Sequence, residues 1–325
     1  MILFEDVADI PADFGPTVIA IGKFDGVHAG HRALIEKMLV DAASTDARTV
    51  AVTFDRNPLA LLAPERCPRS LVGVTQKVEL LGRTGIDATL MLRFDEALAS
   101  EEPEAFVRRV IVAGLHAQRV LVGSDFRFGR GGAGDAALLR RMGAELGFAV
   151  EEVADVASAE DGRRVSSTWI RELLDAGDVE RAAKLLGRYP AVTGEVVHGL
   201  KRGRELGFPT ANLSPDTEGY VPADGVYAGW LIERSPQGVL RSGARYPAAI
   251  SVGTNPTFDD VDVPQVEAYV IDETGLDLYG RRVEIQFVTR IRGMVAFEGV
   301  DKLVEQMTDD VVQARLALTD AAAGR

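Results

Sequence analysis

The sequence predicts an α/β domain with a parallel sheet, followed by a small antiparallel β-barrel or sandwich and a terminal helix. Three observations lead to this prediction. A chain of 325 residues exceeds the usual size of a single hydrophobic core. The first half alternates short apolar runs with stretches of helical spacing, whereas strand-like runs follow one another directly after Gly187. We therefore expect two domains, at residues 1–186 and 187–325.

The first domain is expected to contain five buried strands separated by helices. The predicted strands are Thr17–Ile21, Thr49–Phe54, Thr89–Arg93, Arg119–Val122 and Phe148–Val153, and the predicted helices are Arg32–Ala42, Gln76–Arg83, Pro103–Ala113 and Asp135–Leu146. Repeated strand–helix alternation favours a parallel sheet covered on both faces. Because ligands of such sheets bind at the carboxyl ends of strands, the loops after Ile21, Phe54 and Val122 are candidate sites.

Two further helices precede the second domain, which is expected to be rich in β-structure. The helices are Thr168–Ala176 and Val179–Leu186; the strands are Tyr189–His198, Gly225–Glu233, Tyr246–Val252, Gln265–Asp272 and Arg281–Arg292. Glycine and proline between the strands indicate an antiparallel arrangement. The chain closes with a helix from about Val300 to Leu318, whose predicted apolar face comprises Val300, Leu303, Val304, Met307 and Val311.

Composition disfavours several classes of protein. The chain has 36 basic and 49 acidic residues, a net charge of −13, which would repel nucleic acid and anionic membranes. Its apolar runs are shorter than the ~20 residues that span a bilayer. The acidic start lacks the features of a secretory signal, and the single cysteine, Cys67, fits a reducing compartment. We expect a cytoplasmic protein without nucleic-acid or membrane partners; its oligomeric state, monomer or weak oligomer, stays open.

A glycine-rich turn follows the first predicted strand. It contains Gly22, Phe24, Asp25, Gly26, His28, Gly30 and His31. The glycines let the backbone approach a ligand, and the start of the following helix suits a phosphate. Two histidines three residues apart would point the same way and could stabilise a phosphoryl group undergoing displacement. Surface histidines or a metal pair are the alternatives, but no third ligand has an evident spacing to them.

Two other segments of the first half carry side chains suited to a phosphate-bearing ligand. Ser166, Ser167 and Thr168 gather hydroxyl groups at a helix start between Arg164 and Arg171. These side chains favour a triphosphate, although a single hydroxyl of this kind more often caps the helix. In the loop after Val122, Asp125 is followed by Phe126, Arg127 and Phe128. Aromatic rings beside arginines suit an aromatic ligand that carries a phosphate; a flexible connection is the alternative.

The second half contains one basic, glycine-rich segment with a possible cation site. Gly199, Arg202, Gly203 and Arg204 form a plausible phosphate-binding loop. Thr210 and Asn212 would share one face of a strand and offer two oxygen ligands to a hard cation such as Mg²⁺. Taken alone, the segment is at least as well explained as a polar turn beside an edge strand.

The motifs together resemble those of one family. The segment Phe24–His31 resembles the H-x-G-H motif of the nucleotidylyltransferase superfamily and, more narrowly, that of bacterial bifunctional riboflavin kinase/FAD synthetases. The segments Gly123–Gly129 and Arg164–Arg171 resemble the flavin loop and the I-S-S-T-x-I-R element of that family. The segment Gly194–Leu213 resembles its riboflavin kinase motif, which Ile250–Phe258 and Val266–Ala268 continue. The resemblance covers essentially the whole chain.

The resemblance implies a Rossmann-like nucleotidylyltransferase domain and a riboflavin kinase-like barrel. It implies that ATP and Mg²⁺ serve two reactions, phosphorylation of riboflavin to FMN and adenylylation of FMN to FAD. The implied catalytic residues are His28, His31 and Glu267, the implied flavin ligands are Asp125, Phe126, Arg127 and Phe128, and Thr210 with Asn212 would hold Mg²⁺. The implied nucleotide ligands are Gly22, Phe24, Asp25, Gly26, Arg164, Ser166, Ser167, Thr168, Arg171, Gly199, Arg202, Gly203, Arg204, Thr210 and Asn212.

Two positions depart from the family pattern. Arg56 and Asn57 replace a proline and a histidine after the second strand, and Asp259-Asp260 stands where glycine is usual. These departures leave two rival hypotheses. One is a nucleotidylyltransferase with another phosphate-bearing acceptor; the other is a flavin-binding storage or regulatory protein without catalysis. The close Pro209–Asn212 match and the presence of Glu267 count against the first rival. Against the second count the intact His28, His31, Thr210, Asn212 and Glu267.

Overall fold

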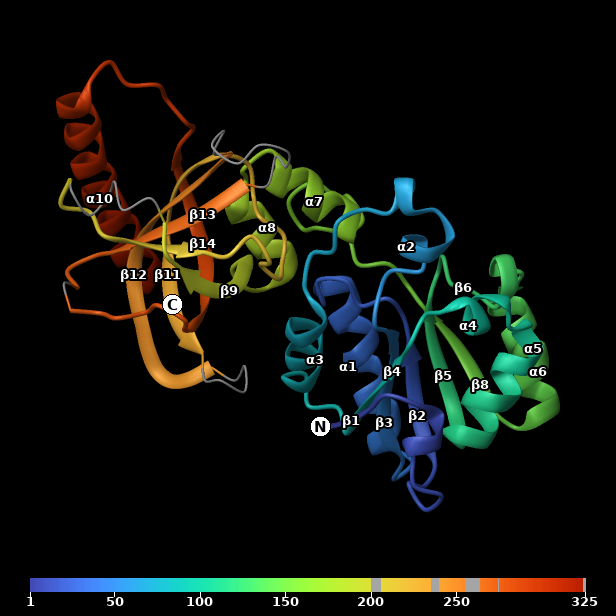
Figure 1. Ribbon diagram of the computed structural model, residues 1–325. Coiled ribbons are helices and arrows are strands. Elements are labelled where there is room, and N and C mark those ends of the chain that lie inside the picture. Colours follow the sequence, from blue (N-terminus) through green and yellow to red (C-terminus); the bar gives the residue numbers. More distant parts are fainter. Residues whose placement is uncertain (200–205, 235–239, 255–263, 274, 324–325) are drawn as a thin grey trace. The chain divides into compact units, whose positions relative to one another are not determined.

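The computed structural model describes residues 1–199, 206–234, 240–254, 264–273 and 275–323. It divides by contacts into two compact units, Met1–Ser167 and Thr168–Arg325. The first unit is an α/β domain, and the second is a closed barrel with helices packed on it (Figure 1). Both fold classes predicted from the sequence are confirmed. No helix within the described ranges is long and apolar enough to cross a membrane.

The first unit is built on a six-stranded parallel sheet. Its strands are β1 (Ile2–Phe4), β2 (Thr17–Ile21), β3 (Arg48–Phe54), β4 (Ala88–Leu92), β5 (Ala117–Gly123) and β8 (Ala149–Val153), in the order β1-β4-β3-β2-β5-β8. The five predicted strands are present within about two residues at each end. The edge strand β1 was not predicted, because it is only three residues long, too short for its apolar run to indicate a strand.

Alternating side chains of the sheet build two cores. The helices of this unit are α1 (Ala29–Ala43), α2 (Leu59–Leu62), α3 (Val74–Gly82), α4 (Glu96–Ser100), α5 (Pro103–Phe106) with a π-helical continuation over Val107–Gly114, and α6 (Ala136–Leu146). Ile19 and Ile21 pack toward the α5 and α6 side, whereas Val18 and Ala20 pack toward α1 and α3. Both faces of the sheet are therefore covered, as the uninterrupted apolar strands predict (Figure 1).

The second unit is a six-stranded antiparallel barrel. Its strands are β9 (Ala191–Val197), β10 (Thr210–Leu213), β11 (Gly225–Arg234), β12 (Leu240–Thr254), β13 (Pro264–Val270) and β14 (Arg282–Arg292), closed in the order β10-β13-β12-β11-β14-β9. Five of these strands were predicted from the sequence. The sixth, β10, has only four residues, too few to show an alternation of its own.

Helices α7 (Ser167–Asp175) and α8 (Val179–Leu186) are anchored to the barrel. The Tyr220 hydroxyl donates to Asp175 Oδ1 over 2.7 Å, and the Ala223 amide donates to the Leu174 carbonyl over 2.9 Å. By contacts, therefore, both helices group with the second unit. The predicted boundary at residues 186 and 187 instead groups residues 168–186 with the first domain.

The terminal helix α10 (Val300–Ala323) packs on the barrel through its second half. Ala314 and Leu318 are buried there, and Val311, Ala317 and Ala321 pack beside them. The predicted apolar face was wrong at its start, because Val300 is 59% exposed. Asp310 on this helix forms a two-contact ion pair with Arg292 of β14, with distances of 2.8 and 2.6 Å. The small alanine side chains of the second half let the helix approach the strands closely.

Candidate active sites

The loop between β2 and α1 carries the two predicted catalytic histidines. Phe24, Gly26 and Val27 have φ angles of 48°, 86° and 41°, a conformation that is unfavourable for the two non-glycine residues. Phe24 and Val27 are also almost fully buried, so their packing offsets this strain. The chain then enters α1 directly after His28. The buried Phe24 ring cannot touch a ligand, so its contribution to a nucleotide site is through the backbone.

The rings of His28 and His31 lie stacked on the first turn of α1. Their centroids are 3.7 Å apart with an interplanar angle of 18°, as the three-residue spacing predicts. Gly30 makes this arrangement possible, because a Cβ atom there would lie 3.2 Å from His28 Cε1. The glycine of the H-x-G-H motif therefore leaves room for the first histidine ring. The first amides of α1 have no partner within the helix, and such a helix start favours a phosphate group.

The segment with three hydroxyl groups meets the same loop. Ser167 Oγ donates to the carbonyl oxygen of Asp25 over 2.8 Å. Ser166 precedes it, and Thr168 and Arg171 follow on α7. The structure thus joins Ser167 to the glycine-rich loop, although the two are 142 positions apart in the sequence.

Arg164 lies between two carboxylates in this structure. Its Nη2 atom donates to Asp125 Oδ2 over 3.1 Å, and its Nε atom lies 3.1 Å from Asp155 Oδ1. Asp155 also accepts a hydrogen bond from Ser124. Arg164, predicted to bind nucleotide, is therefore tied to Asp125, predicted to bind flavin. Asp155 was not predicted, because its relation to Arg164 arises from the hairpin that pairs Ala157 with Arg164.

The predicted flavin loop contains a short hairpin, β6 (Arg127–Phe128) paired with β7 (Gly134–Asp135). Phe126 and Phe128 stack with centroids 5.3 Å apart, and Phe128 is 8% exposed against Phe106. Phe128 therefore supports Phe126 from the core side. Arg127 is exposed and lies 3.6 Å from Asp135, so its guanidinium group remains accessible to an anion.

The departure at Asn57 has a structural explanation. Asn57 Oδ1 accepts a hydrogen bond from the Leu59 amide over 3.1 Å, at the start of α2. Arg56 pairs with its neighbour Asp55 over 3.3 Å. The Asn57 side chain therefore accepts the amide hydrogen at the start of α2. A histidine would not accept it in the same way.

The second cluster lies on adjacent barrel strands. Asn212 of β10 is directly opposite Glu267 of β13. Thr210 Oγ1 donates to Glu267 Oε2 over 3.3 Å, and Asn212 Nδ2 donates to Thr210 Oγ1 over 3.2 Å. The barrel therefore joins three predicted site residues, two of them 57 positions apart in the sequence. Burial raises the pKa of Glu267, and the Thr210 hydrogen bond opposes that shift.

Two further residues shape the second cluster. Gly199 leaves space for the amide of Asn212, because a Cβ atom there would lie 2.6 Å from Asn212 Cγ. Gln265 Nε2 donates to Asn212 Oδ1 over 3.3 Å. Gln265 was not among the predicted site residues, although the two-residue strand period places it on the face of Glu267. Arg202, Gly203, Arg204 and the segment 255–263, with its Asp259-Asp260 departure, lie outside the described residues.

The side chains of the second cluster fit a divalent cation. Thr210 and Asn212 offer a hydroxyl and an amide oxygen, which are ligands of hard cations, and the Glu267 carboxylate lies beside Thr210. No group of three or more His, Cys, Asp or Glu side chains suited to a metal occurs in the parts of the chain that the structure describes. A cation held here would consequently depend on phosphate oxygens for further ligands.

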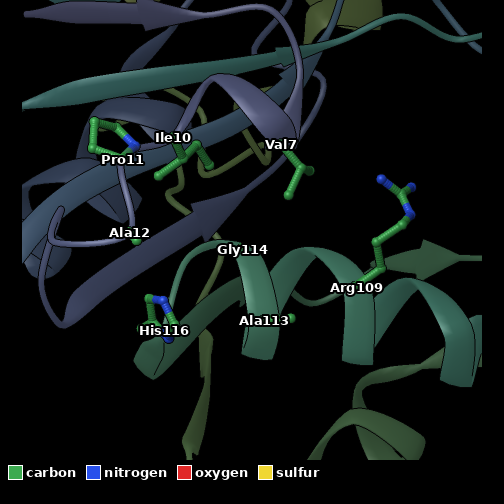
Figure 2. A pocket seen from close by; sticks show the side chains of 8 residues that line it. All are labelled: Val7, Ile10, Pro11, Ala12, Arg109, Ala113, Gly114 and His116. Carbon is green, nitrogen blue, oxygen red and sulfur yellow. The ribbon is translucent and has the colours of Figure 1, made fainter.

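A surface pocket of about 480 Å³ lies at the opposite edge of the sheet from the histidines. It is lined by Val7, Ile10, Pro11, Ala12, Arg109, Ala113, Gly114 and His116 (Figure 2). These residues precede β2 and β5, whereas the histidines follow β2. Arg109 is bound to Glu101 through two contacts of 2.7 Å. The pocket contains none of the predicted site residues.

Comparisons with known proteins identify both halves of the chain. The FAD synthetase family profile matches residues 10–169, and the riboflavin kinase profile matches residues 186–318. The bifunctional riboflavin kinase/FMN adenylyltransferase of Escherichia coli K12 is 36% identical over 92% of this chain and 91% of its own length. The enzyme of the same name from Pseudomonas fluorescens is 35% identical over 92% of each chain.

A solved structure extends the similarity to the fold. The crystal structure of a protein named as a macrolide-efflux protein, from Streptococcus pneumoniae, superimposes with a TM-score of 0.84. It is 32% identical, and the match covers 97% of this chain and 98% of that chain. The name of that protein refers to a different activity from that of the curated relatives. Identity of 36% and 35% over nine-tenths of both chains decides the family. The chain belongs to the bifunctional riboflavin kinase/FMN adenylyltransferase family.

Proposed function

We propose that the two activities of the family are divided between the two clusters described above. The chain is a bifunctional transferase that phosphorylates riboflavin to FMN and adenylylates FMN to FAD. The assignment of residues to these reactions is our proposal. One observation supports it. Thr210, Asn212 and Glu267 come together within the part of the chain that matches riboflavin kinase, whereas the stacked histidines belong to the part that matches FAD synthetase.

In the kinase reaction, Glu267 acts as the general base. Its carboxylate accepts the proton of the terminal ribityl hydroxyl as that oxygen bonds to the γ-phosphorus of ATP and ADP leaves. Burial makes the carboxylate a stronger base than an exposed glutamate, in agreement with its raised pKa. Thr210 and Asn212 would hold Mg²⁺, which when bound neutralises phosphate charge. Gly199 and the basic segment Arg202–Arg204 remain predicted ligands of ATP.

In the adenylyl transfer, His28 and His31 act on the phosphates. An oxygen of the FMN phosphate attacks the α-phosphorus of ATP, and pyrophosphate leaves. The histidine rings and the amino terminus of α1 stabilise negative charge on the transferred group. The remaining nucleotide ligands predicted in this half are Gly22, Phe24 (through its backbone), Asp25, Gly26, Arg164, Ser166, Ser167, Thr168 and Arg171. The predicted flavin ligands are Asp125, Phe126, Arg127 and Phe128.

The binding partners and the cellular location of the enzyme are also part of our proposal. Its small-molecule partners are riboflavin, FMN, FAD and ATP, with nucleic acid and membrane surface excluded on the ground of the −13 net charge. The free thiol of Cys67 supports a cytoplasmic location.

Two parallel incubations test the proposed function. The purified chain is mixed with riboflavin, ATP and Mg²⁺, and the flavins are separated; in parallel, FMN replaces riboflavin. We expect FMN and FAD in the first reaction, and FAD with pyrophosphate in the second. FAD from FMN without any FMN from riboflavin would reduce the protein to a nucleotidylyltransferase. Bound flavin without turnover would make it a binding protein, and either result would contradict the proposal.

A further inference from the structure

Lys77 is a buried lysine at the carboxyl edge of the parallel sheet. It lies on α3, its residue is 7% exposed, and its Nζ atom donates to the carbonyl oxygen of Phe54 over 2.9 Å. Phe54 is the last residue of β3, next to the strand that leads to the histidines. Lysine is seldom buried to this degree unless its charge is balanced, so the surroundings of the ammonium group require explanation.

Two carboxylates balance this charge. Burial lowers the pKa of the Lys77 ammonium group, and the charges of Asp25 and Asp55 oppose that shift. Each carboxylate is itself fixed to the backbone: Asp25 Oδ1 accepts from the Leu71 amide over 2.8 Å, and Asp55 Oδ1 accepts from the Phe94 amide over 2.9 Å. The Lys77 ammonium group is thus linked to the loops after β2 and β3, which carry Asp25 and Asp55. These two carboxylates in turn hold the segment before α3 and the loop after β4.

The loop after β2 depends on such attachments. It contains positive φ angles at Phe24 and Val27, and strained backbone persists only where the surrounding structure holds it. Thr53 Oγ1 holds the loop through the Lys23 carbonyl over 3.1 Å, and Asp25 holds it through the Leu71 amide. The negative charge of Asp25 favours the charged form of Lys77 and so opposes the lowering of its pKa by burial. The loop ends at His28, so a shift of the loop displaces the histidine pair.

We propose that Lys77 is a positioning residue for adenylyl transfer, balancing Asp25 and Asp55 so that the loop after β2 presents His28 and His31 at the correct place. This inference rests on the proposed function of the histidines and adds a residue outside the family motifs described above. The ammonium group is buried and bound to a main-chain carbonyl, so its role is exerted through the loops and not on the substrate.

The test compares Lys77→Met with Lys37→Met. Methionine keeps most of the volume of the lysine stem and removes the charge. Lys37 is the matched control: it also pairs with two carboxylates, Asp41 and Glu151, but its side chain is 38% exposed and lies on the surface of the same domain. For each variant, kcat and KM for FMN and ATP are measured in FAD formation, together with riboflavin kinase activity and thermal unfolding.

We expect Lys77→Met to lower kcat of FAD formation by about 10- to 100-fold, the usual effect of a small misplacement of catalytic groups, with KM values within about threefold of the parent. Kinase activity of the same preparation is expected to be unchanged, and Lys37→Met is expected to match the parent. The double variant Lys77→Met/Asp55→Asn is expected to recover part of the lost rate, because it removes one of the two carboxylates that the lysine balances.

Three results would overturn the inference: a parental kcat in folded Lys77→Met, a loss confined to KM, or equal losses in Lys37→Met. If Lys77→Met does not fold, Lys77→Gln takes its place; it removes the charge but keeps an N–H donor for the Phe54 carbonyl, and a parental kcat in that variant would equally refute positioning. Failure of the proposed function is distinguishable, since in that case the parent protein itself would form no FAD.

Discussion

The substitution Glu267→Gln separates the two activities most sharply. Glutamine keeps the size of the side chain and an oxygen that accepts the Thr210 hydroxyl, which lies 3.3 Å from Glu267 Oε2. The barrel geometry is therefore expected to remain. What is lost is the ability to take a proton from the ribityl hydroxyl group. We expect riboflavin phosphorylation to fall strongly while supplied FMN is still converted to FAD.

The magnitude follows from the role of the carboxylate. A general base contributes about 10²- to 10⁴-fold, equivalent to about 3 to 5 kcal/mol of activation free energy. Burial disfavours the charged form of Glu267 and so raises its pKa. The carboxylate therefore takes up a proton at a higher pH than an exposed glutamate would. Kinase rate should consequently decline on acidification at a higher pH than an ordinary carboxyl group would produce. Glu267→Gln should abolish that decline.

The assay follows FMN formation from riboflavin and FAD formation from FMN in one preparation, across a range of pH. Glu195→Gln is the matched control, because Glu195 is an exposed residue of the same barrel, on β9. A folded Glu267→Gln protein with a kinase rate within a few-fold of the parent would remove Glu267 from the role of base. An unchanged acid limb in that variant would assign the pH dependence to another group.

Three other variants test the histidine pair, Gly199 and the ion pair of Asp310. His28→Ala/His31→Ala should reduce FAD formation by at least about 10²-fold and leave FMN formation intact; loss of both activities in a folded protein would contradict the division. Gly199→Ala places a Cβ atom 2.6 Å from the Asn212 side chain, so kinase rate should fall about tenfold with FAD formation from FMN unchanged; a parental kinase rate would show that the amide can move without consequence. Asp310→Ala leaves its arginine partner on β14 without a counter-charge, and thermal unfolding should show a loss of about 3 kcal/mol, at the lower end for buried pairs because that arginine is partly exposed; an unchanged Tm would show that the pair adds nothing to stability.

Most of the fold could be predicted because it rests on local patterns. The apolar run Thr17–Ile21 is buried at every residue, and the observed strand has the predicted bounds. The alternating strands of the second half close into a barrel, one of the two arrangements that the sequence left open. Two elements were not predicted because they are very short: β1 is three residues long and β10 is four residues long. Their pairing with distant strands, not their own periodicity, makes them strands.

The site residues divide in the same way. The spacing of His28 and His31 predicts a shared direction, since three residues along a helix return to the same face, and the rings are indeed stacked. The burial of Phe128 and the capping role of Asn57 could not be predicted, because each depends on what packs against the residue. Lys77 was not predicted for the same reason, because nothing in its neighbouring sequence distinguishes it from a surface lysine of an amphipathic helix.

The sequence by itself determined the fold classes, the order of the two modules and the residue types available for phosphate transfer. Periodicity and motif spacing are properties of neighbours in the chain, and they are visible without coordinates. Only the tertiary structure decided that Glu267 meets Thr210, that Ser167 meets Asp25, and that α7 and α8 pack with the barrel. Such contacts depend on strand register and on loop paths, which arise from the packing of the whole domain and are not encoded in any short segment.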